Sequence, residues 1–220
     1  REAGFYKSPD LKEDRIFLSD FFEDPDKNPL GTPSGKIEIF SETIDSFNYE
    51  DCPGHPTWME PTEWLGAKEK AYPLHIISNQ PKTKLHSQMD NGTLSSSIKI
   101  KGHQPLEMNP DDAKSRGITQ GDIVRVFNGR GSCLCGVNIT TDVMPGVVII
   151  STGSWYDPAE PNDPKSMCKH GNPNVLSPDI GTSKLGQGPA AHSCLVEIEI
   201  YDGPTQDITA FNPPEIIEKK

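Results

Sequence analysis

The stretch Asn109-Pro110-Asp111-Asp112-Ala113, which continues through Gly117-Ile118 to Gly121-Asp122-Ile123-Val124-Arg125-Val126, decides the fold of this chain. Asn109 is suited to cap a helix, because its side chain can accept from the backbone N–H of Asp111 or Asp112. Pro110 fits the first helical position, and Gly117 fits the left-handed conformation that ends many helices. The run after Gly121 alternates apolar and polar residues, so the stretch predicts a short capped helix followed by a β-strand.

Other short strand signals surround this stretch. Asn128-Gly129 is a hairpin turn signal, with apolar runs on both sides. Strands are expected at 35–40, 72–77, 98–101, 122–127, 132–140, 147–150 and 194–200. Six or seven such strands, with one or two short helices, bury their apolar faces most readily as a closed β-barrel. The expected fold class is therefore α+β, mainly β.

Length and composition indicate one barrel domain with extensions. The chain has 220 residues, a hydrophobic fraction of 33%, 19 Gly and 21 Pro, which favours short strands and long ordered loops over a helical bundle. We expect an extended N-terminal arm and connection at 1–71, the barrel at 72–201 and a polar tail at 202–220. The chain does not start with Met, so we expect it to be a processed, nicked or cut part of something longer.

The charge and hydropathy patterns exclude several classes of protein. A formal net charge of −11 repels phosphate backbones, so nucleic-acid binding is not expected. No apolar run approaches the ~20 residues of a membrane span, and the first residues show no signal-peptide pattern. Locally, Lys82, Lys84, Lys99 and Lys101 form a basic group that an anionic small ligand would need. The alternative is that these four are ordinary solvated lysines.

A dense set of polar side chains follows the expected strand at 72–77. The stretch Ser78-Asn79-Gln80-Pro81-Lys82-Thr83-Lys84-Leu85-His86-Ser87-Gln88 brings amides, hydroxyls, cations and an imidazole together. Buried donors without partners cost about 1–3 kcal/mol each, so such a bend favours a polar ligand. A solvated surface loop is the competing interpretation.

A second unusual segment runs from Thr152 to Pro189 with little regular pattern. Loops of this length are usually functional. Glycines at 181, 186 and 188 permit close approach of backbone to a ligand. The pattern is not a GxGxxG fingerprint and no strand–helix unit surrounds it, which excludes a Rossmann dinucleotide site.

The five cysteines do not form a disulfide pattern. Their number is odd and their spacing fits no common framework. Cys133 and Cys135 share one face of an expected strand and, with Cys168 and His170, could make a zinc site. Separate structural cysteines are the alternative.

Several motifs in order resemble the C-terminal domain of molybdopterin oxidoreductases, in the dimethyl sulfoxide, trimethylamine N-oxide and biotin sulfoxide reductase branch. The resemblance rests on 30–39, 54–58, 78–88, 109–126, 155–158 and 172–188. It implies a double-psi β-barrel that clamps two pterin dinucleotides holding molybdenum, the bis(molybdopterin guanine dinucleotide) cofactor. Lys84 departs from the family, in which many relatives have arginine, and lysine lacks the bidentate guanidinium fork.

The resemblance also implies which residues contact the cofactor. The first group, which would touch pterin or phosphate, is Ser78, Asn79, Gln80, Pro81, Lys84, His86, Ser87 and Gln88. The second group, which would close over the cofactor from the late loop, is Asn172, Asn174, Gln187 and Gly188. No catalytic or metal-ligating residue is expected in this chain, because the family's metal ligand lies far upstream.

The implied whole enzyme reduces S-oxides or N-oxides by oxygen-atom transfer, with its upstream catalytic part as the partner of this chain. Another activity of the superfamily, such as a transhydroxylase or a dehydrogenase, is the near alternative. A non-catalytic double-psi barrel acting as a binding module is a further one, since fold does not fix function. The resemblance favours the periplasm, whereas five cysteines without a disulfide pattern favour the cytoplasm.

Overall fold

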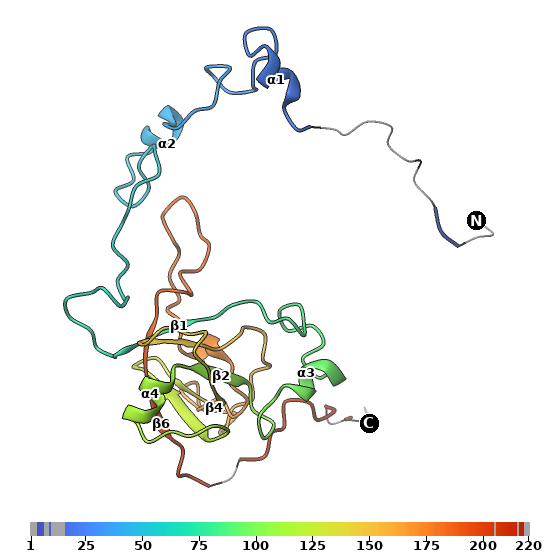
Figure 1. Ribbon diagram of the computed structural model, residues 1–220, viewed down its shortest axis with the longest axis vertical. Coiled ribbons are helices and arrows are strands. Elements are labelled where there is room, and N and C mark those ends of the chain that lie inside the picture. Colours follow the sequence, from blue (N-terminus) through green and yellow to red (C-terminus); the bar gives the residue numbers. More distant parts are fainter. Residues whose placement is uncertain (1–3, 7–8, 10–15, 205, 215, 218–220) are drawn as a thin grey trace. The chain divides into compact units, whose positions relative to one another are not determined.

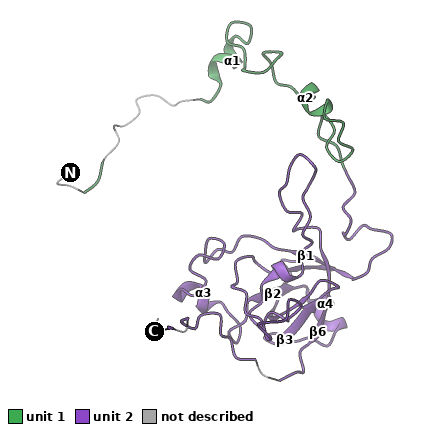
Figure 2. Ribbon diagram, turned by 180° about the vertical axis from the view of Figure 1, so that it is seen from behind, with its two compact units in different colours: residues 1–58 green, residues 59–220 purple. Residues whose placement is uncertain are grey.

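Two units divide the chain in the computed structural model, which describes residues 4–6, 9, 16–204, 206–214 and 216–217. Unit 1 is Arg1–Trp58 and unit 2 is Met59–Lys220, coloured separately in Figure 2. The expected arm at 1–71 therefore spans the unit boundary. Its first residues and the last residues of the expected tail lie outside the described part. The described helices include none that is long and apolar enough to cross a membrane.

Six strands of unit 2 close into a barrel, which confirms the expected fold class. They are β1 (Leu74–Ile77), β2 (Pro105–Met108), β3 (Ile123–Phe127), β4 (Ser132–Ile139), β5 (Val147–Ile149) and β6 (Leu195–Ile200). Their order around the barrel is β1-β5-β2-β4-β3-β6. The pairs β1·β5 and β2·β4 are parallel and the other four are antiparallel, so the sheet is mixed (Figure 1).

The core lies inside the barrel and follows the period-two alternation of the strands. Val124 and Val126 of β3 are fully buried, and so are Leu106 and Met108 of β2. Residues between them face outward, as the pleat of a strand requires. Glu107, between two buried neighbours, therefore stands on the outer face of the barrel.

The helix and hairpin expected after Asn109 are confirmed. Helix α4 (Pro110–Ser115) begins with the Asn109 side chain accepting from Asp111 N at 3.0 Å. The Asn109 amide also donates to Val143 O at 2.7 Å, which joins the cap to the approach to β5. Gly117 has φ +67°, the left-handed conformation expected at the helix end.

The strand expected at 98–101 is wrong. Helix α3 (Thr93–Ser97) precedes this segment, and Ile100 and His103 form a tight turn with two backbone hydrogen bonds of 3.0 Å. The strand lies instead at Pro105–Met108, where a proline is tolerated because it is the first residue. The alternation of Ile98-Lys99-Ile100-Lys101 resembles a strand with exposed lysines, but the Lys99 side chain is buried in an ion pair with Asp90.

The strand expected at 35–40 is also wrong. Unit 1 contains α1 (Ser19–Glu23) and α2 (Glu42–Asp45), and no strand among its described residues. Ile37 and Ile39 are 71% and 79% exposed. A strand needs a neighbouring strand to accept and donate its backbone hydrogen bonds. Alternation of apolar and polar residues alone does not form a strand where such a neighbour is missing.

The late segment expected at 152–189 lacks regular structure except for the 3-10 helix η1 (Pro173–Val175) and isolated bridges. Its first part packs against the barrel. Its second part, after Leu176, forms a narrow loop in which Thr182 N donates to Gly188 O at 2.8 Å. Figure 1 shows this loop, in orange, extending beyond the strands of the barrel.

Candidate ligand pocket at the end of strand β1

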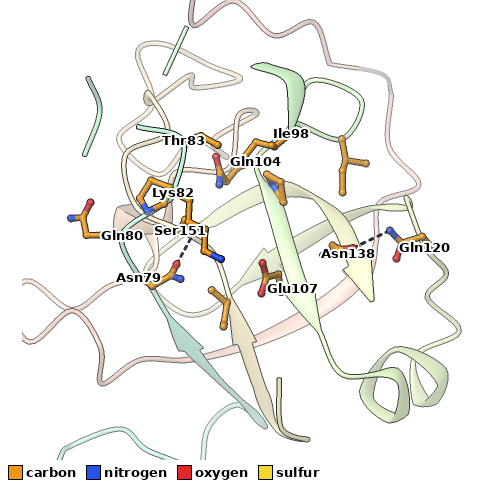
Figure 3. Close-up of a pocket in the computed structure, with 14 residues that line it drawn as sticks. Asn79, Gln80, Lys82, Thr83, Ile98, Gln104, Glu107, Gln120, Asn138 and Ser151 are labelled. Atoms are coloured by element: carbon orange, nitrogen blue, oxygen red, sulfur yellow. Dashed lines mark hydrogen bonds between the residues drawn. The ribbon is translucent and has the colours of Figure 1, made fainter. Parts of the chain in front are cut away.

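A pocket of about 580 Å³ opens where the chain leaves β1. This volume suits a small organic ligand, for which pockets measure about 300–1,000 Å³. Three candidate residues, Asn79, Gln80 and Pro81, line one wall together with Lys82 and Thr83 (Figure 3). The remaining lining residues are Ile98, Ile100, Gln104, Pro105, Glu107, Gln120, Asn138, Ile149 and Ser151.

The near wall is fixed by hydrogen bonds to the segment after β5. Asn79 Oδ1 accepts from Ser151 Oγ at 2.7 Å, and Asn79 O accepts from Thr152 N at 2.9 Å. The Asn79 amide nitrogen is left to donate, and the side chain is exposed. Gln80 Nε2 donates to His86 Nδ1 at 2.9 Å, so the His86 Nε2 carries the proton. This wall therefore offers N–H donors to a ligand.

The far wall was not anticipated from the sequence. Glu107 of β2 and Asn138 of β4 are direct partners in the parallel ladder, so their side chains stand next to each other on the outer face. Gln120 Nε2 donates to Asn138 Oδ1 at 3.2 Å, which leaves the Asn138 amide nitrogen free to donate elsewhere. The Glu107 carboxylate has no side-chain hydrogen bond or ion pair within the described part of the chain, although its backbone belongs to the ladder. Polar residues alternating with core residues are typical of solvated faces, so no sequence signal marked them.

The other residues of the stretch 78–88 lie around the pocket but not in its lining. Ser78 is half-buried and its N–H donates to His192 Nδ1 at 3.4 Å. The side chains of His86, Ser87 and Gln88 are exposed. Trp155 Nε1 donates to Ser87 O at 2.8 Å, so the backbone here is held while the side chains face outward.

Lys84 does not take the place expected for it. Its side chain is 1% exposed, and Nζ donates to Asp90 Oδ1 at 2.5 Å and to Gln104 Oε1 at 3.4 Å. An ammonium in this position cannot reach a ligand without leaving a buried carboxylate. The structure therefore places Lys84 in a buried ion pair and not in the lining of the pocket, and a charge paired inside the protein is costly to expose singly.

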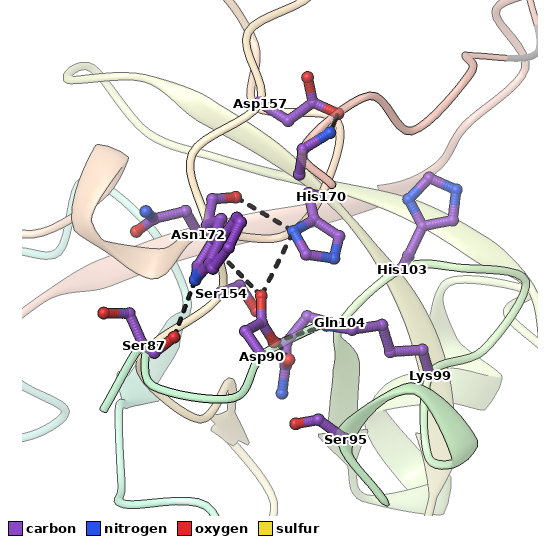
Figure 4. A network of polar contacts seen from close by, with 12 residues as sticks. Ser87, Asp90, Ser95, Lys99, His103, Gln104, Ser154, Asp157, His170 and Asn172 are labelled. Atoms are coloured by element: carbon purple, nitrogen blue, oxygen red, sulfur yellow. Dashed lines mark hydrogen bonds and ion pairs between the residues drawn. The ribbon is translucent and has the colours of Figure 1, made fainter. Parts of the chain in front are cut away.

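Asp90 is the centre of this buried polar network, which the sequence also did not reveal (Figure 4). Its carboxylate accepts from Lys84, from Lys99 at 2.9 Å and from Trp155 N at 3.0 Å. Burial raises the pKa of Asp90, but the hydrogen bonds from the two lysines outweigh burial and hold its pKa below the ordinary value. Burial also lowers the pKa of Lys99, against the opposing effect of Asp90.

His170 borders the network as a neutral imidazole. Burial, and then the charge of Lys99, lowers its pKa to about 4. The approach of His170 Nδ1 to Asp90 Oδ2 at 3.7 Å is therefore not an ion pair at neutral pH. Nδ1 donates to Trp155 O at 3.1 Å, and Nε2 has no partner among the described residues.

The candidate residues of the late segment lie outside the pocket. Asn172 Oδ1 accepts from Asn174 N at 2.9 Å and so caps η1, while the Asn174 side chain is exposed. Gln187 Nε2 donates to the carbonyls of Ser183 and Lys184, and Gly188 O accepts from Thr182 N. Gln187 and Gly188 are thus engaged within their own narrow loop.

The zinc site considered for Cys133, Cys135, Cys168 and His170 is not formed. The two strand thiols lie 4.0 Å apart, but His170 directs its ring to Trp155 and Asp90. Across the described residues, no group of three or more His, Cys, Asp or Glu side chains could hold a metal ion. All five cysteines are free thiols, four of them buried, which fits separate structural roles.

Several known proteins match this chain over most of its length at about half identity. Dimethyl sulfoxide/trimethylamine N-oxide reductase of Cereibacter sphaeroides is 48% identical over 200 residues, which is 91% of this chain and 24% of that protein. Trimethylamine-N-oxide reductase of Salmonella typhimurium is 51% identical over 197 residues, 88% of this chain and 23% of that protein. The chain thus spans about a quarter of the length of the curated relatives it matches.

Structural and family comparisons agree on the domain. Acetylene hydratase from Pelobacter acetylenicus superposes with a TM-score of 0.64 over 81% of this chain and 25% of its own, at 19% identity, which shows a shared fold. A family model described as "Molydopterin dinucleotide binding domain" matches residues 74–195, more than half of the chain. This match confirms the resemblance seen in the motifs, and the chain belongs to the molydopterin dinucleotide binding domain family.

Proposed function

We propose that this chain is the cofactor-binding part of a molybdenum oxidoreductase that reduces S-oxides or N-oxides. The observation that carries the proposal is the pocket of exposed amides at the end of β1, in a chain about half identical to proteins named as such reductases. No catalytic or metal-ligating residue is assigned to the chain itself. The oxygen-atom transfer would be supplied by molybdenum in the bound cofactor, and the rest of the enzyme is the partner of this chain.

The chemistry of the pocket fits one end of a dinucleotide. Asn79 and Gln80 present amides, which pair with the polar edges of purine or pterin rings, and Lys82 brings an exposed cation for phosphate. Ile98, Ile100 and Ile149 give an apolar surface against which a flat ring can lie. Pro81, Ser78, His86, Ser87 and Gln88 would complete the contacts from this loop, and Asn172, Asn174, Gln187 and Gly188 would add contacts from the late segment.

We infer that the cofactor is the guanine form, bis(molybdopterin guanine dinucleotide) molybdenum. Support comes from Glu107 and Asn138, adjacent on the pocket's far wall. A carboxylate can accept from the two N–H groups on one edge of guanine, and a neighbouring amide nitrogen can donate to the carbonyl oxygen beside them. Cytosine offers no such pair of adjacent N–H groups. Hydrolysis of the cofactor released from the enzyme, followed by nucleotide chromatography, tests this point, and CMP in place of GMP would contradict it.

The location proposed for the enzyme is the periplasm. It rests on the family resemblance alone, and the buried positions of four free cysteines are compatible with either compartment. Fractionation of cells that express the full-length protein, with activity followed in each fraction, distinguishes the periplasm from the cytoplasm.

The substitution Asn79→Ala in the full-length enzyme tests the assignment of the pocket. Because Asn79 is exposed, its loss should leave the melting temperature of the barrel nearly unchanged and lower the molybdenum content per folded molecule. Asn162→Ala is the matched control, an exposed asparagine in a loop that does not line the pocket. Equal molybdenum content in both variants would contradict the assignment.

Two results obtained with the unmodified enzyme would favour a different function. Molybdenum and cofactor present without reduction of any S-oxide or N-oxide would favour a transhydroxylase or a dehydrogenase. A stable 24.2 kDa species that binds no pterin and associates with no larger chain would favour a binding module.

A further inference from the structure

The loop from Ser78 to Asp90 combines a fixed backbone with exposed side chains. Trp155 Nε1 holds Ser87 O at 2.8 Å, and Trp155 N holds the Asp90 carboxylate at 3.0 Å. Gly153 packs so closely that a Cβ placed on it would lie 1.8 Å from His86 O. The side chains of His86, Ser87 and Gln88 nevertheless remain exposed. A recognition loop that is ordered before binding has this arrangement, because ordering after binding would cost affinity.

Two residues of the loop adopt a conformation that the free chain would avoid. His86 has φ +49° and Met89 has φ +62°, both in the left-handed region, although neither is glycine. Each such residue costs on the order of 1–2 kcal/mol. Strained residues persist only where surrounding contacts determine them, and they gather at ligand sites. The contacts that hold this loop must therefore offset the strain.

Asp90 supplies the strongest of these contacts, since it is fully buried and charged. Lys84 and Asp90 lie on either side of both strained residues in the sequence, so their ion pair closes the loop on itself. Lys99 ties the same carboxylate to the segment before β2, and Trp155 ties it to the segment after β5. Gln104 accepts from Lys84 and from Ser154 and also lines the pocket, which connects the network to the ligand space.

The C-terminal tail packs over the same network. Phe211 lies edge-on to Trp155 and His170, with ring centroids 5.3 Å and 4.9 Å away. The tail is anchored by Asp157, whose carboxylate accepts from Thr209 N, Thr209 Oγ1 and Ala210 N at 2.7–3.1 Å. Lys169 adds a second buried ion pair there, 3.3 Å from Asp157. Water is thereby kept from the Asp90 charges, which strengthens their attraction.

We propose that Asp90, through Lys84, is a positioning residue that fixes the 78–90 loop in the shape that binds the cofactor. The proposal rests on the function proposed above for that loop. Asp90 itself would touch no ligand. Its effect would be to keep His86, Ser87 and Gln88 aimed outward before the cofactor arrives, so that its loss speeds cofactor release more than it weakens the fold.

The test compares Lys84→Met with Lys169→Met in the full-length enzyme. Each variant removes one buried ammonium from a buried aspartate that keeps its other hydrogen bonds, and Asp157 still holds the tail. For each, we would measure the melting temperature, the molybdenum and guanine content per folded molecule, and the rate of cofactor release in mild urea. Lys84→Met should release cofactor about tenfold faster than Lys169→Met and broaden the molybdenum EPR signal.

Each outcome has a separate meaning. Equal release rates in two variants of similar stability would overturn the positioning role while leaving the proposed function intact. Absence of molybdenum and guanine from the unmodified enzyme would overturn the proposed function, and the inference with it. If Lys84→Met does not fold, Trp155→Phe replaces it, because this change deletes the bond to Ser87 O and keeps an aromatic ring beside Phe211. It should then speed release about threefold relative to Lys169→Met, and an unchanged rate would refute the inference.

Discussion

Replacing Gly153 by alanine perturbs the candidate loop from beneath without altering any residue proposed to contact the cofactor. Gly153 has φ +93°, and a Cβ there would lie 1.8 Å from His86 O, 2.3 Å from His86 C and 3.0 Å from Ser87 N. These neighbours are backbone atoms, so no side-chain rotation can relieve the clash. The carbonyl of His86 must move by about 1.2 Å to restore a separation of 3.0 Å.

Two costs add in this variant. The left-handed conformation costs an alanine about 1–2 kcal/mol, and displacing packed backbone costs about 1–3 kcal/mol more. The displacement also has a functional consequence, since a shift of about 1 Å in a positioning element can change binding or rate by about 10²-fold. We therefore expect Gly153→Ala to lower stability by about 2–5 kcal/mol and to reduce cofactor content at least tenfold per folded molecule.

Gly117→Ala is the control for backbone strain alone. Gly117 has φ +67°, but no atom lies within 4 Å of a Cβ built there, and it does not line the pocket. Both variants of the full-length enzyme would be assayed by urea denaturation and by molybdenum content of the folded fraction. Gly117→Ala should lose about 1–2 kcal/mol of stability and keep its cofactor. Cofactor retention in Gly153→Ala equal to that of Gly117→Ala would refute the reasoning.

Three further predictions concern the stability of the barrel. The pKa of His170 is about 4 in the folded chain and 6.5 ordinarily. Between these pH values the unfolded chain binds the proton more strongly, so the free energy of unfolding falls as the pH is lowered, by up to about 3 kcal/mol. His170→Gln should be less stable at pH 7 but lose less between pH 6.5 and 4, and parallel urea curves for variant and parent would contradict this. Glu63→Gln breaks a bidentate ion pair with Arg130, whose two contacts measure 2.6 and 3.0 Å. The variant should lose about 1 kcal/mol of stability in thermal melting at low salt, and an unchanged melting temperature would show that the pair does not stabilise the barrel. Asn109→Ala removes the cap of α4 and should lower the stability of the barrel by about 1–2 kcal/mol. A variant that loses helical circular dichroism but keeps the denaturation midpoint of the parent would contradict this prediction.

The local parts of the fold could be predicted because their signals lie within a few residues. The cap at Asn109, the left-handed Gly117 and the hairpin between β3 and β4 each depend on neighbours in sequence. The segment 98–101 could not be predicted this way. Its alternation resembles a strand, but the ion pair of Lys99 with Asp90 buries the residue that the pattern marks as exposed. Tertiary pairing overrides period in so short a run.

The candidate site divides in the same way. Asn79, Gln80 and Pro81 belong to a polar stretch after a recognisable strand, the family resemblance marks them as cofactor contacts, and the structure places all three in one pocket. Glu107 and Asn138 depend on the parallel pairing of β2 with β4, which joins segments far apart in the chain. Asp90 gave no signal, since a single aspartate between polar residues ordinarily indicates a solvated turn. The sequence therefore indicates one wall of the pocket, whereas the opposite wall and the buried support depend on contacts between separate segments.

Hydrogen exchange of the full-length enzyme, compared with and without its cofactor, tests the central claim most directly. The account expects the cofactor to slow exchange of backbone amides in 79–89, with smaller protection in 172–188. Exchange around Lys114 and Gly117, which do not line the pocket, should stay the same. Protection that falls on 113–119 and leaves 79–89 unchanged would show that the cofactor binds elsewhere and would contradict the account.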